Sequence, residues 1–145
     1  MNNRSDFFSS MFAHELNLRI YYEDTDVAGM VYHANYLKFM DRGRTEWLRA
    51  IGFEQGQIAR RDSLIFVVAG VRLDFKKPVY LDEEIVVRTV LKKMGGVSLG
   101  LYQAIKNEHN EINCEGFIKL GCVDAVTYKL KMIPEKIKRR IHHGD

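Results

Sequence analysis

The chain has 145 residues, 46% of them hydrophobic, and a formal net charge of +3 from 22 basic and 19 acidic side chains. This length and composition suit one domain with a real core, which we expect over residues 1–145 with the core at about 16–131. The nearly balanced charge argues against a dedicated nucleic-acid-binding protein.

The N-terminal segment Met1–His14 contains apolar side chains but is interrupted by Arg4, Asp6 and serines. It therefore lacks the continuous apolar run of a signal peptide. No other stretch approaches the roughly 20 apolar residues that a membrane span requires. A cytoplasmic protein is the expectation that follows.

The first predicted elements are a strand over residues 16–23 and a long helix. Leu16, Leu18 and Ile20 alternate with polar neighbours, which is typical of a strand. From about residue 34 the apolar residues recur at three- and four-residue steps, which indicates a helix with one buried face. The positions on that face are Tyr36, Phe39, Met40, Gly43, Trp47 and Ile51. Gly52 then supplies a C-terminal stop.

Glycine and charge have specific meanings in this helix. Gly43 lies within the apolar stripe although glycine costs about 1 kcal/mol of helix stability relative to alanine, so we expect another backbone to approach it closely. The charged residues Asp41, Arg44 and Glu46 predict a solvated outer face, with Arg42 spaced to pair with Glu46.

A short helix at 54–61 precedes four strand-like segments at 64–77, 83–94, 97–107 and 112–130. Gly95-Gly96 predicts a hairpin, because both residues tolerate positive φ. One helix of some 18 residues cannot cover both faces of such a sheet. The predicted fold is therefore α+β, with a curved antiparallel sheet of about five strands wrapped around the helix. The exposed edge or face that remains favours a dimer.

The two cysteines, Cys114 and Cys122, lie eight residues apart in one apolar, strand-like run. A disulfide between them requires the strand to fold back on itself, so we expect two buried free thiols.

The last predicted element is a basic amphipathic helix at about 134–142. Its apolar side is formed by Ile133, Ile137 and Ile141, and its other side by Lys136, Lys138, Arg139 and Arg140. Two interpretations stay open: a terminal helix docked on the domain, or a contact with an acidic surface, either anionic lipid or an acidic carrier protein.

Candidate chemistry is concentrated in the stretch Tyr21–Leu37. The first turn of the predicted helix has unsatisfied N–H donors, which suit a carbonyl oxygen that becomes negative during reaction. A nearby carboxylate can attack that carbonyl or activate water against it. Spacing alone leaves open whether Asp24 or Asp26 does so, or whether both only form the turn. His33 is equally open between a functional and a local packing role.

Other catalytic patterns are absent from the sequence. It contains no Gly-x-Ser-x-Gly elbow, no phosphate-binding loop and no Cys-x-x-Cys, and its histidines lack the spacing of a zinc site. Nucleophilic serine, P-loop and metal chemistry are therefore disfavoured.

The acidic stretch and its surroundings closely resemble the signature of the YbgC-like acyl-CoA thioesterases, relatives of 4-hydroxybenzoyl-CoA thioesterase. The resemblance covers roughly residues 18–135. The positions that carry it are Tyr21-Tyr22-Glu23-Asp24-Thr25-Asp26, Gly29, Val31-Tyr32-His33, Asn35-Tyr36-Leu37, Phe39, Arg42, Arg44, Phe66-Val67-Val68, Lys77-Pro78, Leu81-Asp82-Glu83, Gly96-Val97-Ser98 and Cys122-Val123-Asp124. It departs at Asp41-Arg42-Gly43-Arg44, where the motif commonly continues Glu-x-Ala-Arg.

This resemblance implies a hotdog fold, homodimers with a continuous sheet that often form tetramers, and active sites between subunits. It implies that Asp26, and not Asp24, is the catalytic carboxylate. Tyr22 and His33 match active-site positions, and the backbone N–H of His33 is expected to polarise the thioester carbonyl. Gly29 and Val31 are expected to bind substrate.

The expected reaction is hydrolysis of an acyl-CoA thioester to a free acid and CoA, without a metal or redox cofactor. Asp26 acts either as nucleophile, through a mixed anhydride, or as general base for water. The phosphates of CoA need positive charge, for which Lys92 and Lys93 are candidates together with Ser98. The alternative for the two lysines is an exposed strand end.

A second hypothesis is a non-catalytic acyl-binding or scaffold module. Such a module docks an acyl carrier protein or an envelope-associated partner through the basic C-terminal helix. The joint presence of Tyr22, Asp26 and His33 weighs against it.

Overall fold

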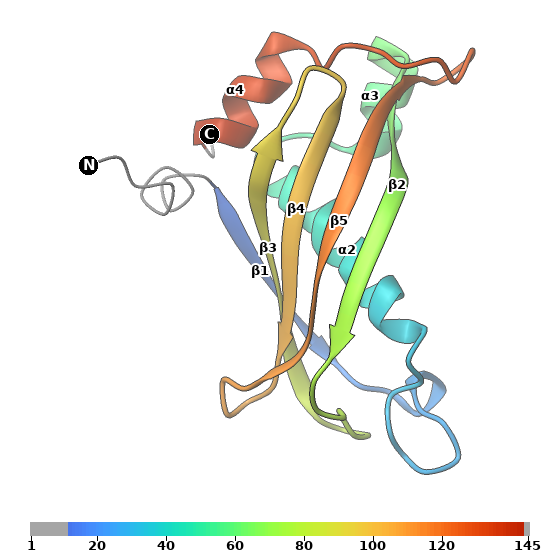
Figure 1. Cartoon of the computed structure of the whole chain (residues 1–145), viewed down its shortest axis with the longest axis vertical. Helices are drawn as coiled ribbons and strands as arrows, with labels where there is room; N and C mark the ends of the chain where they lie inside the picture. The colour runs from blue at the N-terminus through green and yellow to red at the C-terminus, as the bar shows by residue number, and fades with distance from the viewer. Residues whose placement is uncertain (1–11, 144–145) are drawn as a thin grey trace.

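The computed structural model describes residues 12–143, so most of the segment Met1–His14, for which no signal peptide was expected, lies outside the described residues. The elements in chain order are β1 (Ala13–Arg19), the short 3-10 helix η1 (Tyr22–Asp24), α2 (Asn35–Ala50), α3 (Gln55–Asp62), β2 (Leu64–Phe75), β3 (Glu84–Met94), β4 (Ser98–Lys106), β5 (Ile112–Asp124) and α4 (Glu135–His143). Across the sheet the strand order is β1-β3-β4-β5-β2, with every pair antiparallel (Figure 1). Within the described part, no helix is long and apolar enough to cross a bilayer.

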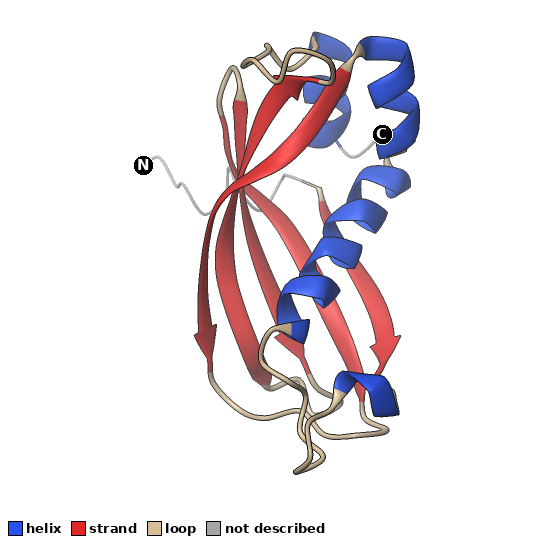
Figure 2. Ribbon diagram, turned by 90° about the vertical axis from the view of Figure 1, so that its right-hand side faces the viewer, coloured by secondary structure: helices blue, strands red, loops and turns tan. Residues whose placement is uncertain are grey.

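The helices lie on one side of the sheet, which curls around α2 (Figure 2). The core lies between them, and Phe39, Met40 and Trp47 of α2 are almost completely buried there. Burying such side chains stabilises the fold by about 1.5–3 kcal/mol each relative to exposure. The predicted long helix within a curved five-stranded sheet is confirmed, although α2 is 16 residues long and begins at Asn35.

The centre of α2 differs from the sequence expectation in two ways. A Cβ on Gly43 would lie 2.6 Å from Cγ1 of Val87, so the close approach comes from side chains of the sheet and not from another backbone. Arg44 was expected on a solvated face but is only 9% exposed, and it donates a hydrogen bond to Gln103. Glu46 pairs with Arg49 at 2.7 Å, so the expected pairing with Arg42 is also wrong.

Two strands end earlier than their apolar patterns indicated. β1 ends at Arg19, and the N–H of Tyr21 donates to the carboxylate of Asp24 at 2.8 Å, which turns the chain into η1. β5 ends at Asp124, six residues before the expected end at Leu130. The carboxylate of Asp124 accepts N–H bonds from Val126 and Thr127, which folds the chain back. Short-range hydrogen bonds thus overrule an apolar run.

The hairpin between β3 and β4 forms where Gly95-Gly96 predicted it, but for a different reason. Neither glycine has positive φ. A Cβ on Gly95 would lie 2.9 Å from Oγ of Ser98, and the N–H of Gly95 donates to the Ser98 carbonyl at 2.8 Å. Close packing inside the turn is therefore what requires glycine here.

The C-terminal helix α4 is docked on the domain. Ile133, Ile137 and Ile141 are buried. Arg140 donates to the carbonyl of Ile51 at 2.9 Å, and Lys136 pairs with Asp62 at 3.2 Å. Cys114 and Cys122, further along the core, are buried free thiols as expected.

Candidate active site

The stretch around Asp26 folds into a tight turn that its own carboxylate stabilises. Oδ1 of Asp26 accepts N–H bonds from Ala28 at 2.9 Å and Met30 at 3.2 Å. The backbone closes the same turn through bonds from Asp26 N–H to the Met30 carbonyl and from Gly29 N–H to the Asp26 carbonyl. Gly29 has φ of +79°, a conformation that side chains disfavour. Oδ2 of Asp26 accepts no hydrogen bond from residues 12–143, so it is available for chemistry.

This turn is fixed to the segment that follows the edge strand β2. The N–H of Val31 donates to the Val79 carbonyl at 2.8 Å, and the N–H of Leu81 donates to the Gly29 carbonyl at 3.1 Å. Residues Met30 and Tyr80 form an isolated antiparallel bridge. These contacts hold Asp26 in place although its side chain is exposed.

The start of α2 is fastened to the other aspartate of the motif. The Asn35 side-chain amide donates to the carbonyl of Asp24 at 2.8 Å, and the N–H of Tyr32 donates to the same oxygen at 3.0 Å. His33 therefore lies in the turn just before α2, and its N–H donates no hydrogen bond within the described residues. An amide in this position retains the capacity to bind a carbonyl oxygen.

Asp26 and His33 line one open cavity of about 350 Å³. Its other lining residues are Met30, Val31, Tyr36, Phe75, Lys76, Lys77 and Pro78. Tyr36 is buried and its ring lies 5.6 Å from that of Phe75, whereas Phe75 is more than half exposed. Burial raises the pKa of the Tyr36 phenol, which keeps it neutral. The cavity is thus lined by Asp26 and His33, each of which keeps one polar group without a partner in the described residues, beside an apolar wall.

The structure separates the two aspartates by position. Asp24 belongs to η1, where its carboxylate caps the turn through Tyr21. Asp26 also stabilises a turn, but only one of its carboxylate oxygens does so. Asp26 is also one of the residues that line the cavity, whereas Asp24 is not. Of the remaining expected site residues, Val31 lines this cavity, Gly29 shapes the turn, and Tyr22 lies outside the cavity lining with 84% of its surface exposed.

The expected phosphate-binding residues lie elsewhere. Lys92, Lys93 and Ser98 line a separate hollow near the β3–β4 hairpin, whereas the Asp26 turn lies at the opposite end of the sheet (Figure 1). One protomer therefore does not bring them together with Asp26 in a single cavity. Within residues 12–143, no group of three or more His, Cys, Asp or Glu side chains is placed to hold a metal ion.

Six of the nine cavity residues were not identified from sequence as functional, among them Tyr36 and Phe75. Tyr36 was assigned to the helix core and Phe75 to a strand, because apolar periodicity does not distinguish a core side chain from a pocket wall. The signal for Phe75 is its place at the end of β2, two residues before Lys77-Pro78 of the motif.

Comparisons with known proteins show which family the chain resembles. The family model described as "Thioesterase-like superfamily" matches residues 21–141. Acyl-CoA thioesterase YbgC of Haemophilus influenzae is 34% identical over 126 residues, covering 87% of this chain and 92% of the relative. Acyl-CoA thioester hydrolase YbgC of Escherichia coli O6:H1 is 38% identical over 120 residues, covering 83% and 89%.

Among solved structures, a 4-hydroxybenzoyl-CoA thioesterase variant complexed with 4-hydroxybenzoyl-CoA superposes with a TM-score of 0.81. The match covers 89% of this chain and 98% of that one at 14% identity, so it supports the fold alone.

Proposed function

The chain belongs to the thioesterase-like superfamily, and from this premise we propose that it hydrolyses acyl-CoA thioesters to a free acid and CoA with Asp26 as the working carboxylate. The observation that carries the proposal is the cavity shared by Asp26 and His33, in which one carboxylate oxygen and one backbone amide lack partners within the described residues.

The chemistry follows from these two groups. The N–H of His33 binds the thioester carbonyl oxygen and stabilises the negative charge that develops on it. Oδ2 of Asp26 attacks the carbonyl carbon and displaces CoA as its thiolate, leaving a mixed anhydride that water hydrolyses. Alternatively, Asp26 removes a proton from a water molecule that attacks the same carbon. Both routes use the same geometry.

Other parts of the proposed site have supporting roles. The His33 imidazole lies 4.6 Å from the Tyr32 ring and faces the edge of Phe75 at 6.4 Å, so it can orient substrate or water against the apolar wall. Tyr22 is exposed in the single chain, so it can contact a bound acyl group only where another surface packs over the site.

A second copy of the chain supplies such a cover. β2 is an edge strand that pairs with β5 on one side only, and it exposes Val67, Val68, Val71 and Phe75. Unpaired apolar edges favour pairing with another strand. We therefore propose a homodimer in which β2 pairs with its symmetry mate, so that the cavity beside Phe75 lies at the contact. Association into a tetramer and a cytoplasmic location stay predictions.

The position of α4 weakens the second hypothesis, in which a non-catalytic module docks a partner through its basic C-terminal helix. Two of the four basic residues of this helix, Lys136 and Arg140, contact their own domain, and its apolar side is buried. Lys138 and Arg139 are left for an acyl carrier protein or an anionic membrane surface. A docked terminal helix accounts for most of this segment.

The decisive experiment is the substitution Asp26→Asn. The new side-chain amide retains an oxygen that accepts the Ala28 and Met30 N–H bonds, but the negative charge of the carboxylate is lost. We expect an intact fold and a loss of about 10²–10⁴ in kcat against a panel of acyl-CoA thioesters. The matched control is Asp24→Asn, which keeps an acceptor for Tyr21 and should retain most activity. Near-wild-type turnover by Asp26→Asn would refute the assignment.

A further inference from the structure

Asn113, near the start of β5, has a polar side chain in the interior and is only 1% exposed. It lies at a strand irregularity. The register of β4 against β5 shifts between Ile105 and Lys106, where Asn113 is left without a pairing partner on β4. A β-bulge of this kind takes a side chain out of the regular alternation. Asn113 and Cys114 are therefore both buried although they are consecutive.

Asn113 bonds to the segment that leaves the edge strand β2. Its backbone carbonyl accepts the N–H groups of Lys76 at 2.8 Å and Lys77 at 3.1 Å. Its side-chain amide donates to the carbonyls of Lys77 at 3.4 Å and Pro78 at 3.2 Å. The strand has ended at this point, so its backbone groups need partners other than the bonds of the sheet. Asn113 supplies them to three consecutive residues.

Core stability alone does not account for an asparagine at this position. Oδ1 of Asn113 is buried and accepts no hydrogen bond from residues 12–143. A buried acceptor without a partner costs free energy that an apolar side chain avoids. An apolar side chain, however, lacks the NH2 group that bonds to Lys77 and Pro78. What Asn113 contributes is therefore the fixed position of this segment.

The segment fixed by Asn113 continues directly into the residues that hold the turn carrying Asp26, here called the catalytic turn. Main-chain hydrogen bonds join residues 79–81 to residues 29–31. Residues 26–29 themselves are exposed, so apolar packing does not hold them. The position of Asp26 relative to the rest of the domain therefore depends on these bonds, and on where residues 79–81 lie.

Residues 79–81 are attached to the domain at both ends, by different partners. At the downstream end, the N–H of Asp82 donates to the Ile20 carbonyl at 3.1 Å, and the N–H of Ile20 donates to the Glu83 carbonyl at 2.9 Å. At the upstream end the attachment is Asn113, through the residues just before 79. Removing the side-chain amide of Asn113 therefore loosens one end while the other stays fixed.

We infer that Asn113 is a positioning residue of the catalytic turn: through Lys77-Pro78 and the residues that follow, it fixes where the carboxylate of Asp26 lies against the thioester. This inference rests on the proposed thioesterase function. Asn113 is buried and is not among the residues that line the Asp26 cavity, so it acts on the reaction only through the turn. Its effect falls on kcat, because misplacing a reacting group lowers the rate of the chemical step.

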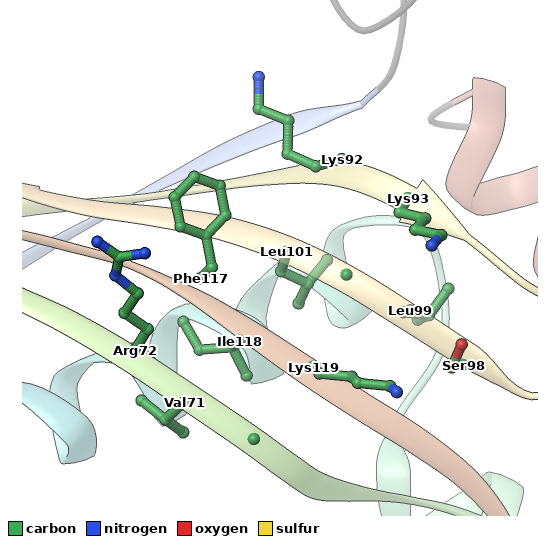
Figure 3. A pocket seen from close by; sticks show the side chains of 12 residues that line it. Val71, Arg72, Lys92, Lys93, Ser98, Leu99, Leu101, Phe117, Ile118 and Lys119 are labelled. Atoms are coloured by element: carbon green, nitrogen blue, oxygen red, sulfur yellow. The ribbon is translucent and has the colours of Figure 1, made fainter.

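The kinetic test is Asn113→Val, which removes the side-chain amide and keeps a residue that suits a buried strand. We expect kcat with acyl-CoA to fall at least about tenfold, because a displacement of about 1 Å can cost about 10² in rate. KM should change by less than about twofold, since remote binding contacts are unaltered. The expected phosphate-binding residues Lys92, Lys93 and Ser98 line the hollow of Figure 3, at the opposite end of the sheet from the catalytic turn.

A double variant separates positioning from a general loss of structure. In the Asp26→Asn background, Asn113→Val should lower the remaining kcat by less than about twofold, because the group whose position it changes is already inactive. The control is Ile137→Val, which removes one buried methylene from α4 and should leave kcat unchanged at a temperature where every variant is folded. An equal fall of kcat in both backgrounds, or an unchanged kcat in Asn113→Val alone, would overturn the inference.

Amide hydrogen exchange, followed by NMR, tests the inference without catalysis. The N–H groups of Val31 and Leu81 form the bonds between the catalytic turn and residues 79–81. In Asn113→Val, and in the smaller Asn113→Ala, they should exchange at least about tenfold faster while amides of β3 and β4 keep their wild-type rates. Unchanged exchange, or faster exchange throughout the sheet, would refute the role of Asn113. If wild-type protein hydrolyses no acyl-CoA, the proposed function fails, and the exchange rates still decide whether Asn113 holds the turn.

Discussion

Arg44 on α2 donates a hydrogen bond of 3.1 Å to Oε1 of Gln103 on β4, and both side chains are buried. The amide of Gln103 in turn donates to the Met40 carbonyl at 2.9 Å and to the hydroxyl of Thr89 at 2.8 Å. The long helix is therefore attached to two central strands by polar bonds as well as by apolar contact. Burial lowers the pKa of Arg44, and the charge of Asp41 partly offsets this effect.

Removing Arg44 should destabilise the fold. In Arg44→Ala the buried oxygen of Gln103 loses its charged donor, which we expect to lower the free energy of unfolding by about 1–3 kcal/mol, measured by urea denaturation. Arg49→Ala, which removes a half-exposed arginine paired with Glu46, should change it by less than about 1 kcal/mol. Equal effects of Arg44→Ala and Arg49→Ala would contradict this account.

Gly43 should not tolerate alanine, although alanine is the better helix former. The added Cβ would lie 2.6 Å from Val87 and 3.0 Å from the amide of Gln103. We expect Gly43→Ala to cost about 1–3 kcal/mol through overpacking, more than the roughly 1 kcal/mol gained from helix propensity. Gly56→Ala in α3 is the matched control, because its nearest neighbour is the flexible end of Arg60 at 3.4 Å, and it should be neutral or stabilising. Thermal unfolding of both variants, together with Gly43→Ala/Val87→Ala as a relief variant, tests the steric cause.

The fold could be predicted from the sequence because its signals are periodic. The alternation in β3 and the three- and four-residue steps in α2 predict which side of each element is buried. The structure confirms both predictions. The same periodicity contained a warning about Arg44, which is four residues after Met40 and three before Trp47, both buried. The position of Arg44 along the helix therefore predicts its burial better than its charge predicts exposure.

The candidate site was less predictable, for a physical reason. Asp24 and Asp26 both bond to backbone amides, and what separates them is a free oxygen beside a cavity assembled from β2 and α2. No local pattern encodes that contact, so the motif resemblance was needed to choose between them. The hollow near the β3–β4 hairpin was predictable only in part: Lys92, Lys93 and Ser98 were named from sequence, whereas the bulges beside Lys93 and Gly70 that shape it leave no sequence signal.

The proposed dimer can be tested at Val68, a half-exposed residue of the edge strand. In Val68→Asp, two-fold pairing through β2 would bring a carboxylate from each copy into the contact, where like charges repel and lose their hydration. We expect monomers in analytical ultracentrifugation and a fall in thioesterase activity. Val126→Asp, which changes a valine that is 78% exposed after the end of β5, should leave both properties unchanged. A dimer of wild-type strength in Val68→Asp would show that copies associate elsewhere.

The turn after β5 should make stability depend on pH in the acid range. Backbone N–H bonds from Thr127 and Val126, with Lys131 nearby, lower the pKa of Asp124 to about 2 from its ordinary value of 3.8. Because the folded pKa is the lower one, the unfolded chain binds more protons between these values. The contribution of Asp124 is therefore complete above about pH 4 and is lost as the pH falls toward 2.

Asp124→Ala should accordingly be less stable than wild-type protein at pH 7, and the difference between the two should shrink as the pH is lowered from 5 to 3. Urea denaturation at several pH values measures it. Asp74→Ala is the control, because the Asp74 side chain makes no hydrogen bond or ion pair within the described residues, and its difference from wild type should not vary in that way. A wild-type to Asp124→Ala difference that stays constant down to pH 3 would mean that the Asp124 charge does not hold the chain reversal that ends β5.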